Sequence, residues 1–457
     1  MPKVIETKEI NISEVVFHQR DYTREKPKTS TIEQYIDALK GGYEFPPIEV
    51  DVNKDNGKYP LLDGYHRLKA FEESGIEKIL ASFVELEGFP RLLYAAGRNA
   101  VHGDRLTKAE KRAIAEQMVE ESRTVEEVAQ WLQVSKSTVG EWTSHIIKRR
   151  QRSRDAKIWW LHLLGWTTRE IGEVVDVDSK TVSNICGNFP ELEKFCKDQA
   201  SRGQGAEQIA EAQDVSRQLV EAILLQGKTD EQRLETLKIG IQPYDVWNFT
   251  QCDPRFGCEY PGRIPGQLIA HVLYFYTNPG DLIVDPMVGS GTTIDVCAYL
   301  GRKCYGYDAH PRPDRYDIKE HDLILGWPER TKQAQLIFWD PPYFKKKDDG
   351  YGDKSISRLS REQYLSFFAE QIKALPEKFK GRIAFLCSAF NEESDASQNI
   401  FIWDYLTYFI GFGWQVERHI QTPLSTQAVH PDIVKKFRAA RRLARLGRDL
   451  VILRRNA

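Results

Sequence analysis

Residues 281–293 read DLIVDPMVGSGTT, and this stretch decides the fold of the C-terminal half of the chain. A short apolar strand ends in Asp285, a glycine-rich turn follows, and residues 294–300 continue with a helical pattern. Glycines let the backbone approach a ligand, and a helix N-terminus offers free amides. The spacing matches neither a dinucleotide fingerprint nor a phosphate loop. It predicts a nucleotide-type ligand at the carboxyl end of a parallel strand.

A second strand follows at residues 303–307 and ends in Asp308. An acid at the tip of the second strand binds ribose hydroxyls in doubly wound folds. We therefore expect Asp308 to lie beside the glycine-rich loop and to bind a ribose.

A third strand, LIFW at residues 336–339, runs into the sequence DPPY. Two prolines cannot continue a strand ladder, and each restricts its neighbours. The carboxylate of Asp340 and the ring of Tyr343 are thus expected at a stiff strand end, where they suit a planar, hydrogen-bonding ligand such as a base. The plainer alternative is a Pro-Pro turn after a buried strand.

The loop and the DPPY corner together resemble the motifs of amino-group DNA methyltransferases that use S-adenosyl-L-methionine. In that family a D-P-x-x-G-S-G-T-T loop holds the cofactor and a D-P-P-Y loop holds the target base. The similarity covers roughly residues 243–457. It implies a Rossmann-like α/β fold there, with S-adenosyl-L-methionine as the cofactor. It implies cofactor-binding roles for Asp285, Pro286, Gly289, Ser290, Gly291, Thr292, Thr293, Asp308, Asp322, Phe249 and Thr250.

Those roles differ along the expected site. Thr292 and Thr293 suit the carboxylate end of the cofactor, and Asp308 suits its ribose. Asp322 suits the adenine amino group, although an acid in solvent at a strand end is the alternative. Phe249 and Thr250 are carried over from the segment that precedes the loop in the related enzymes.

The catalytic residues implied by the resemblance are Asp340, Pro341, Pro342 and Tyr343. An exocyclic amino nitrogen is a poor nucleophile, because its lone pair is spread into the ring. Asp340 can accept one N–H and the carbonyl of Pro341 the other, while Tyr343 offers a face to a base that must leave the duplex. The chemistry needs no metal. No cysteine follows the motif, which argues against methylation of a cytosine ring carbon.

Composition limits the remaining choices. The chain has 457 residues, a net charge of −2 and seven cysteines without a C-x-x-C pair. Neither a zinc site nor a disulfide framework is indicated, so a reducing cytoplasm fits best. We find no signal peptide and no apolar run of about 18 residues, as a membrane helix would need. DNA binding must therefore use local basic patches, such as residues 148–154 and 435–455.

Residues 1–98 predict a small α/β domain. The pattern P-P-I-x-V … L-D-G-Y-H-R-L-x-A-F resembles the ParB/sulfiredoxin superfamily. The resemblance implies that Gly64, His66 and Arg67 bind a nucleotide, as the G-x-x-R stretch does there. Tyr65 stands where sulfiredoxins carry their catalytic cysteine, so a reductase is not expected. The alternative is a degenerate domain that aids docking or forms a homodimer.

Residues 99–236 contain three repeats of a helix-turn-helix pattern, at residues 127–139, 170–182 and 208–220. Each has a small residue in the first helix, which lets the two helices cross closely. Three units in register predict DNA binding, although a helical connector is the alternative for the third. The expected DNA-binding residues are Lys136, Ser137, Ser179, Lys180, Arg217 and Gln218, with Arg149 and Arg150 of the basic run.

The predicted fold class is α/β: a Rossmann-like methyltransferase domain (243–457), a small α/β ParB-like domain (1–98) and an all-helical helix-turn-helix middle (99–236). The predicted function is methylation of double-stranded DNA at a specific sequence. The resemblance favours adenine N6, because the related enzymes tend to carry Asp at the first place of this motif for adenine and Ser for cytosine N4. The alternatives are cytosine N4 methylation, an RNA base methyltransferase, and a ParB-like regulator with an inert methyltransferase half. No segment is long enough for a large target-recognition domain, so sequence choice is assigned partly to the helix-turn-helix array. A restriction partner stays open.

Overall fold

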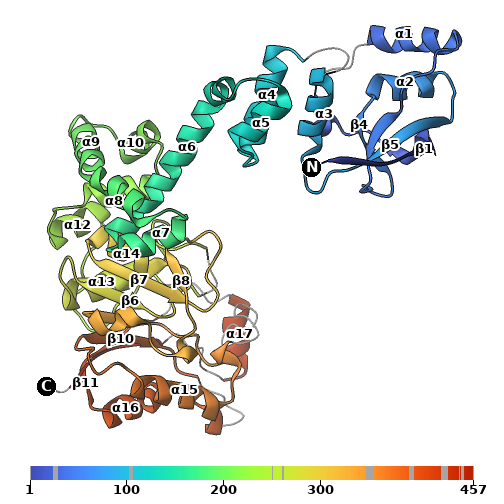
Figure 1. Ribbon diagram of the computed structural model, residues 1–457. Coiled ribbons are helices and arrows are strands. Elements are labelled where there is room, and N and C mark those ends of the chain that lie inside the picture. Colours follow the sequence, from blue (N-terminus) through green and yellow to red (C-terminus); the bar gives the residue numbers. More distant parts are fainter. Residues whose placement is uncertain are drawn as a thin grey trace. The chain divides into compact units, whose positions relative to one another are not determined.

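The computed structural model describes residues 2–23, 29–101, 106–249, 251–259, 262–345, 355–390, 396–423, 431–441, 443 and 447–455 (Figure 1). The chain forms two compact units, Met1–Gln151 and Arg152–Ala457. Within the described residues, no helix combines the length and the apolar character that a bilayer crossing requires.

The first unit begins with a five-stranded mixed sheet in the order β1-β5-β3-β4-β2. Alternating side chains of its strands bury a core that includes Ile48, Val50 and Phe83. A small α/β arrangement is therefore present where the sequence predicts one. Its strands and helices are β1 (Lys3–Asn11), β2 (Val15–Val16), α1 (Thr29–Lys40), β3 (Ile48–Asp51), β4 (Tyr59–Asp63), α2 (Tyr65–Glu73) and β5 (Lys78–Glu85).

Helices follow this sheet and continue into the second unit. The first unit holds α3 (Arg91–Val101), α4 (Lys108–Glu120), α5 (Val125–Leu132) and the start of α6 (Lys136–Leu163). The second unit holds the end of α6, then α7 (Thr168–Val175), α8 (Ser179–Gly187), α9 (Phe189–Ser201), α10 (Ala206–Gln213), α11 (Arg217–Leu224) and α12 (Asp230–Leu237). The region predicted as one helical middle is thus shared by both units.

The three predicted helix-turn-helix repeats have the same local geometry. The first helix of each pair, α5, α7 or α10, ends in a left-handed residue: Gln133, Asp176 and Asp214, with φ of 51°, 55° and 54°. Ser135, Asp178 and Ser216 then cap the second helix of each pair through side-chain oxygens. The sequence repeat therefore corresponds to a repeated turn.

A seven-stranded sheet in the order β11-β12-β10-β9-β6-β7-β8 forms the centre of the second unit. Strands β10, β9, β6, β7 and β8 are parallel, and β12 is antiparallel to both of its neighbours. The elements are α13 (Gly266–Tyr276), β6 (Leu282–Asp285), α14 (Thr292–Leu300), β7 (Lys303–Asp308), β8 (Ile318–Glu320), β9 (Leu336–Trp339), α15 (Arg361–Lys373), β10 (Arg382–Cys387), α16 (Ile402–Gly411), β11 (Trp414–Gln421), α17 (Pro431–Ala439) and β12 (Asp449–Arg455).

This sheet confirms the predicted Rossmann-like class. The chain builds outward from β6 through β7 to β8, and then resumes on the other side of β6 with β9. The strand order thus reverses between β6 and β9. In open α/β sheets, ligands bind at the carboxyl ends of the strands at such a switch point.

Helices α7 to α12 share one hydrophobic core with the seven-stranded sheet, and α7 lies close to its β7–β8 edge (Figure 1). The ring of Trp166 stacks on Tyr305 of β7, with centroids 5.2 Å apart. Glu170 of α7 accepts hydrogen bonds from the Tyr305 hydroxyl (2.7 Å), Lys319 (2.8 Å) and Arg330 (2.8 Å). These hydrogen bonds hold the pKa of Glu170 well below its ordinary value, although burial opposes them. The second repeat is therefore fixed to the β7–β8 edge.

Candidate active site

A cavity of about 490 Å³ lies at the switch point of the second sheet. Its size is in the usual range for a pocket that holds a small molecule or cofactor. The carboxyl ends of β6, β7 and β9 all contribute to its wall. The residues predicted from sequence that line it are Asp285, Gly289, Ser290, Thr292, Thr293, Asp308, Asp322, Asp340 and Pro342.

The glycine-rich loop is held in shape by the acids at the two strand ends. The backbone amide of Gly289 donates to Oδ2 of Asp308 at 3.0 Å. Thr293 donates its hydroxyl to Oδ2 of Asp285 at 2.6 Å, and the Met287 amide donates to the other oxygen at 3.0 Å. Gly291 directly precedes α14 as its N-cap, with φ of 79°, a conformation that favours glycine. Asp285 and Asp308 thus fold the loop around the cavity.

Asp285 is only 2% exposed. Burial raises the pKa of Asp285 to about 7, and the nearby Asp340 and Asp308 push in the same direction. The hydrogen bonds from Thr293 and Met287 oppose this shift only in part. The carboxyl of Asp285 therefore holds its proton over much of the mildly acidic range.

The β7 and β8 side of the cavity carries acids and one exposed apolar side chain. Asp308 accepts from the His310 amide at 2.9 Å, and Asp322 accepts from the Ile324 amide at 3.0 Å. A carboxylate has about four acceptor positions, so both can take further donors. Ile324 is 57% exposed and lines the cavity, where it can cover an aromatic ring. This wall offers acceptors for hydroxyl or amino groups beside an apolar surface.

Sequence reasoning missed several residues of this wall, among them Glu320, His310 and Ile324. Glu320 ends β8, whose three residues were too few to reveal a strand by their pattern. Had that strand been recognised, the rule that predicted Asp308 would also have predicted Glu320. Ile324 stands two residues after Asp322, in the middle of a 3-10 turn (Leu323–Leu325) that Asp322 caps.

The DPPY corner lies at the end of β9, on the other side of the switch point. Asp340 and Pro342 line the cavity, whereas Pro341 is buried. The Tyr343 hydroxyl donates to Oδ1 of Asp340 at 2.8 Å, and Tyr364 donates to the carbonyl of Pro342 at 3.0 Å. Burial and the neighbouring carboxylate raise the pKa of Tyr343 well above its ordinary value. The ring of Tyr343 is thus held beside Asp340 rather than in the cavity wall.

The charges of the cavity test whether S-adenosyl-L-methionine fits it. The wall carries the carboxyl groups of Asp285, Asp308, Glu320, Asp322 and Asp340. It also carries Arg263, whose Nη2 donates to the Asp253 carbonyl and whose buried Nε has no hydrogen-bond partner among the described residues. A ligand with a sulfonium, an ammonium and one carboxylate matches that set, because Arg263 can pair with the carboxylate. A ligand rich in phosphates does not match it.

Some predicted cofactor residues lie elsewhere. Phe249 is half-buried and packs against His271 of α13, with ring centroids 4.9 Å apart, and it is not part of the cavity wall. Thr250 lies outside the described residues. Pro286 and Gly291 belong to the loop that borders the cavity, although they are not among its lining residues.

The predicted DNA-binding residues differ in how many partners their side chains have within the protein. Ser179 and Lys180 are exposed in the first turn of α8. Lys136 forms an ion pair with Glu126, and Ser137 bonds to the hydroxyl of Ser135. Arg217 donates to Glu221 at 2.7 Å and to Glu207 at 3.4 Å, and Gln218 is half-buried. Arg149 and Arg150 both donate to Glu120, through its carboxylate and its carbonyl. Among the described residues predicted to bind DNA, Ser179 and Lys180 of α8 therefore have the fewest side-chain partners.

The predicted nucleotide-binding residues lie at the start of α2. Gly64 has φ of 97°, and a Cβ there would meet the side chains of Ile48 and Arg67. Arg67 donates to the carbonyls of Pro46 (2.8 Å) and Pro47 (2.9 Å) and to Asp63 (2.6 Å). The half-buried His66 ring packs edge-on against Tyr65. The Arg67 guanidinium thus has three bonds within the domain, which favours a structural role.

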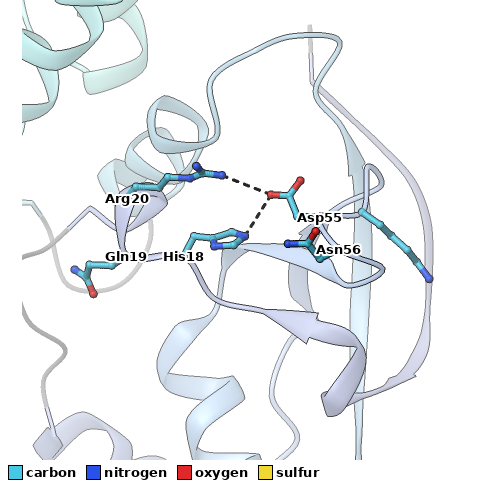
Figure 2. Close-up of a pocket in the computed structure, with 6 residues that line it drawn as sticks. His18, Gln19, Arg20, Asp55 and Asn56 are labelled. Atoms are coloured by element: carbon cyan, nitrogen blue, oxygen red, sulfur yellow. Dashed lines mark ion pairs between the residues drawn. The ribbon is translucent and has the colours of Figure 1, made fainter. Parts of the chain in front are cut away.

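A separate cavity of about 580 Å³ in this domain is lined by residues from two loops. Figure 2 shows His18 and Arg20 directed toward the carboxylate of Asp55, at 3.3 and 3.7 Å. Arg91 also donates to Asp55, at 2.8 Å. The charges of this cavity therefore largely pair with one another.

Comparison with known proteins bears on the second unit. Residues 191–313 match the family model of the N6/N4 DNA methylases. A type II methyltransferase of Methanocaldococcus jannaschii, M.MjaII, is 27% identical over 146 residues, which are 26% of this chain and 28% of that protein. The DNA adenine methyltransferase YhdJ of Escherichia coli is 29% identical over 116 residues, which are 22% of this chain and 39% of that protein. The match thus spans well under two thirds of either relative.

Among solved structures, the first unit resembles the chromosome-partitioning protein ParB of Caulobacter crescentus in complex with the centromeric parS site. The likeness covers 30% of this chain and 70% of that one, at 22% identity and a TM-score of 0.24. Such a TM-score does not establish a shared fold. The family match, by contrast, confirms the amino-methyltransferase resemblance for the cofactor-loop region that it covers.

Proposed function

We propose, from the match of residues 191–313 to the N6/N4 DNA methylase family, that this chain methylates an exocyclic amino group of a base in double-stranded DNA. The observation that carries the proposal is the position of Asp340 in the wall of the cavity that the cofactor loop also lines. One cavity can therefore hold the methyl donor and the accepting amino group together. Placement of two reactants side by side supplies much of the rate enhancement in such a transfer.

S-adenosyl-L-methionine supplies the electrophilic methyl group when it is bound. The carboxylate of Asp340 accepts one N–H of the target amino group, and the carbonyl of Pro341 accepts the other. Both bonds draw the nitrogen lone pair out of conjugation with the base. As the N–C bond forms, the bond between the methyl carbon and the sulfonium sulfur would break and leave its electron pair on a neutral thioether. Asp340 stabilises the positive charge on the nitrogen and takes its proton, which then passes to solvent. Arg263 and Thr293 are assigned to the amino-acid end of the cofactor, and Asp308 to its ribose.

Adenine N6 is the proposed target, with cytosine N4 as the alternative. Two observations support adenine: the acid at the first position of the DPPY motif, and the similarity to a relative named as a DNA adenine methyltransferase. Adenine and cytosine both present an amino group beside a ring nitrogen, so the corner itself accepts either.

Recognition of DNA is assigned first to α8. Helix-turn-helix proteins place the start of the second helix in the major groove. In the second unit, that start carries the exposed Ser179 and Lys180. Because Glu170 fixes α7 to β7 and β8, contacts made by α8 act on the same rigid body that holds the cavity. The third repeat is assigned to structural support, since Arg217 is already paired with two glutamates.

The deciding experiment is mass spectrometry of nucleosides from duplex DNA incubated with the protein and methyl-labelled S-adenosyl-L-methionine. We expect labelled N6-methyl-2′-deoxyadenosine from wild type and none from Asp340→Ala. Labelled N4-methylcytosine would move the target to the alternative base. Label in RNA but not in DNA, or label that persists in Asp340→Ala, would overturn the assignment.

A further inference from the structure

A buried charge cluster lies beneath the cofactor loop. The guanidinium of Arg315 bonds to both oxygens of Asp295, at 3.0 and 2.9 Å. It bonds equally to both oxygens of Asp317, at 2.8 and 3.0 Å. Asp295 and Asp317 are 2% and 3% exposed. Two buried carboxyl groups thus share one guanidinium.

Arg315 touches the loop at the residue that directly precedes α14. A Cβ added to Gly291 would lie 2.4 Å from the guanidinium carbon, so Arg315 lies directly against this glycine. Its Nη2 also approaches the Gly291 carbonyl, at 3.4 Å. On the other side, Asp295 accepts from the amide of Gly257 at 2.6 Å, and the Cys258 amide donates to the Ser290 carbonyl at 3.0 Å. The loop is held between Arg315 and the turn at residues 257–258.

The same cluster is tied to the helical region. The indole N–H of Trp160, near the end of α6, donates to Oδ2 of Asp317 at 2.8 Å. Trp160 is 3% exposed, so water cannot replace this donor. The neighbouring Trp159 donates its indole N–H to the carbonyl of Ile185 in α8, at 3.0 Å. A continuous series of contacts therefore leads from α8 through α6 and Asp317 to Arg315.

We propose that Arg315 is a positioning residue of the cofactor loop and that Trp160 controls cofactor affinity through Asp317 and Arg315. The inference rests on the proposed function, because it takes S-adenosyl-L-methionine as the ligand of the loop. The indole N–H of Trp160 holds the carboxylate of Asp317 in place against Arg315. Without that donor, the hold of Asp317 on Arg315 weakens, and so does the support beneath Gly291. The helices that carry the predicted DNA-reading surface thereby act on the cofactor cavity.

The test compares two tryptophans in the full-length protein. Trp160→Phe removes the donor to Asp317 and keeps an aromatic ring. Trp166→Phe is the matched control: Trp166 is 4% exposed, and its indole N–H donates at 3.0 Å to the Cys304 carbonyl, outside the charge cluster. Calorimetric titration with S-adenosyl-L-methionine gives the Kd of each variant. We expect Trp160→Phe to raise Kd by about three- to tenfold, since hydrogen bonds to charged groups are the stronger ones. Trp166→Phe should stay within about twofold of wild type, with a similar loss of melting temperature.

A double mutant tests whether Trp160 affects cofactor binding through Arg315. If Trp160 acts through Arg315, adding Trp160→Phe to Arg315→Lys leaves Kd unchanged, whereas independent effects would multiply. Multiplying effects, an unchanged Kd in Trp160→Phe, or equal Kd shifts in the two tryptophan variants would each overturn the inference. A wild-type protein that binds the cofactor but methylates no DNA would overturn the proposed reaction and leave this comparison intact. A wild type that binds no cofactor overturns both.

Discussion

Tyr343 donates its hydroxyl hydrogen to Oδ1 of Asp340 at 2.8 Å, so the ring and the acid of the DPPY corner are joined to each other. The ring was expected to stack on the target base, and its hydroxyl instead meets the carboxylate that the amino group requires. Tyr343 can both donate to Asp340 and stack on the base only if its ring, and not its hydroxyl, contributes to the reaction. Tyr343→Phe keeps the ring and removes this hydrogen bond to Asp340.

We therefore expect kcat/KM of Tyr343→Phe to stay within about threefold of wild type. Tyr343→Ala loses a stacking surface worth about 1–3 kcal/mol per base, or roughly 5- to 150-fold in kcat/KM. Steady-state methylation of one duplex at several substrate concentrations measures both variants. Equal losses in the Phe and Ala variants would show that the hydroxyl, and not the ring, carries the role.

The buried acid of the cofactor loop gives a pH dependence of stability. Burial raises the pKa of Asp285 from the ordinary 3.8 to about 7. Between these values the folded protein holds a proton that the unfolded chain has released, so the free energy of unfolding falls as pH rises, by about 1.4 kcal/mol per pH unit at most. Above pH 7 both states are ionised and the loss levels off.

Asp285→Asn removes this titration and can keep the contacts with Met287 and Thr293. Thermal unfolding of wild type and variant, compared at each pH from 5 to 8, isolates the contribution. The melting temperature of wild type should fall relative to the variant up to about pH 7. A constant difference between wild type and variant over that range would mean that Asp285 is already ionised in the folded protein.

The site residues that could be predicted from sequence are the acids at the carboxyl ends of strands. Asp285, Asp308 and Asp340 each follow a recognisable apolar strand, and parallel strands bring such ends to one edge. Arg263 and Ile324 lie in irregular segments with no period to reveal which way they face. Their roles became visible only through burial and exposure, which depend on packing between distant segments.

The tertiary contacts of the helical region could not be predicted from its sequence either. The sequence repeat predicted three helix-turn-helix units, and the left-handed Gln133, Asp176 and Asp214 mark three equivalent turns. The repeat could not show that Glu170 would bond to Tyr305, Lys319 and Arg330, which lie more than a hundred residues away. Identical local patterns thus lead to different surroundings, and only tertiary contacts separate a free reading helix from a structural support.

The glycine that directly precedes α14 has a clear matched control. Gly291 and Gly280 have φ of +79° and +91°, so alanine is strained at both. An added Cβ at Gly280 meets nothing within 4 Å, whereas at Gly291 it meets Arg315. Gly280→Ala should cost about 1–2 kcal/mol of stability and leave cofactor binding unchanged. Gly291→Ala should raise the calorimetric Kd for S-adenosyl-L-methionine more than tenfold, and equal Kd values for the two variants would contradict this.

The arginine in the cavity wall predicts a difference between two ligands. Arg263 has a buried Nε without a partner among the described residues, and it is assigned to the carboxylate of the cofactor. Methylthioadenosine carries the adenosine but no amino-acid end. Arg263→Ala should weaken S-adenosylhomocysteine about 10- to 100-fold, as expected for a hydrogen-bonded ion pair, and leave methylthioadenosine within about twofold. Equal weakening of both ligands in calorimetric titrations would place Arg263 in a structural role.

Two exposed cations of the helix-turn-helix units should differ in their contribution to DNA binding. Lys180 begins α8, whereas the guanidinium of Arg217 is engaged by Glu207 and Glu221. Each phosphate contact releases counterions, so its loss lowers the slope of log Kd against log salt by about 0.9. Lys180→Ala should show such a loss in fluorescence anisotropy titrations of duplex DNA at several salt concentrations. Arg217→Ala should change the slope by less than about 0.3, because that cation must first leave two carboxylates before it can reach a phosphate. A larger change of this slope for Arg217→Ala than for Lys180→Ala would show that the third repeat also contacts DNA.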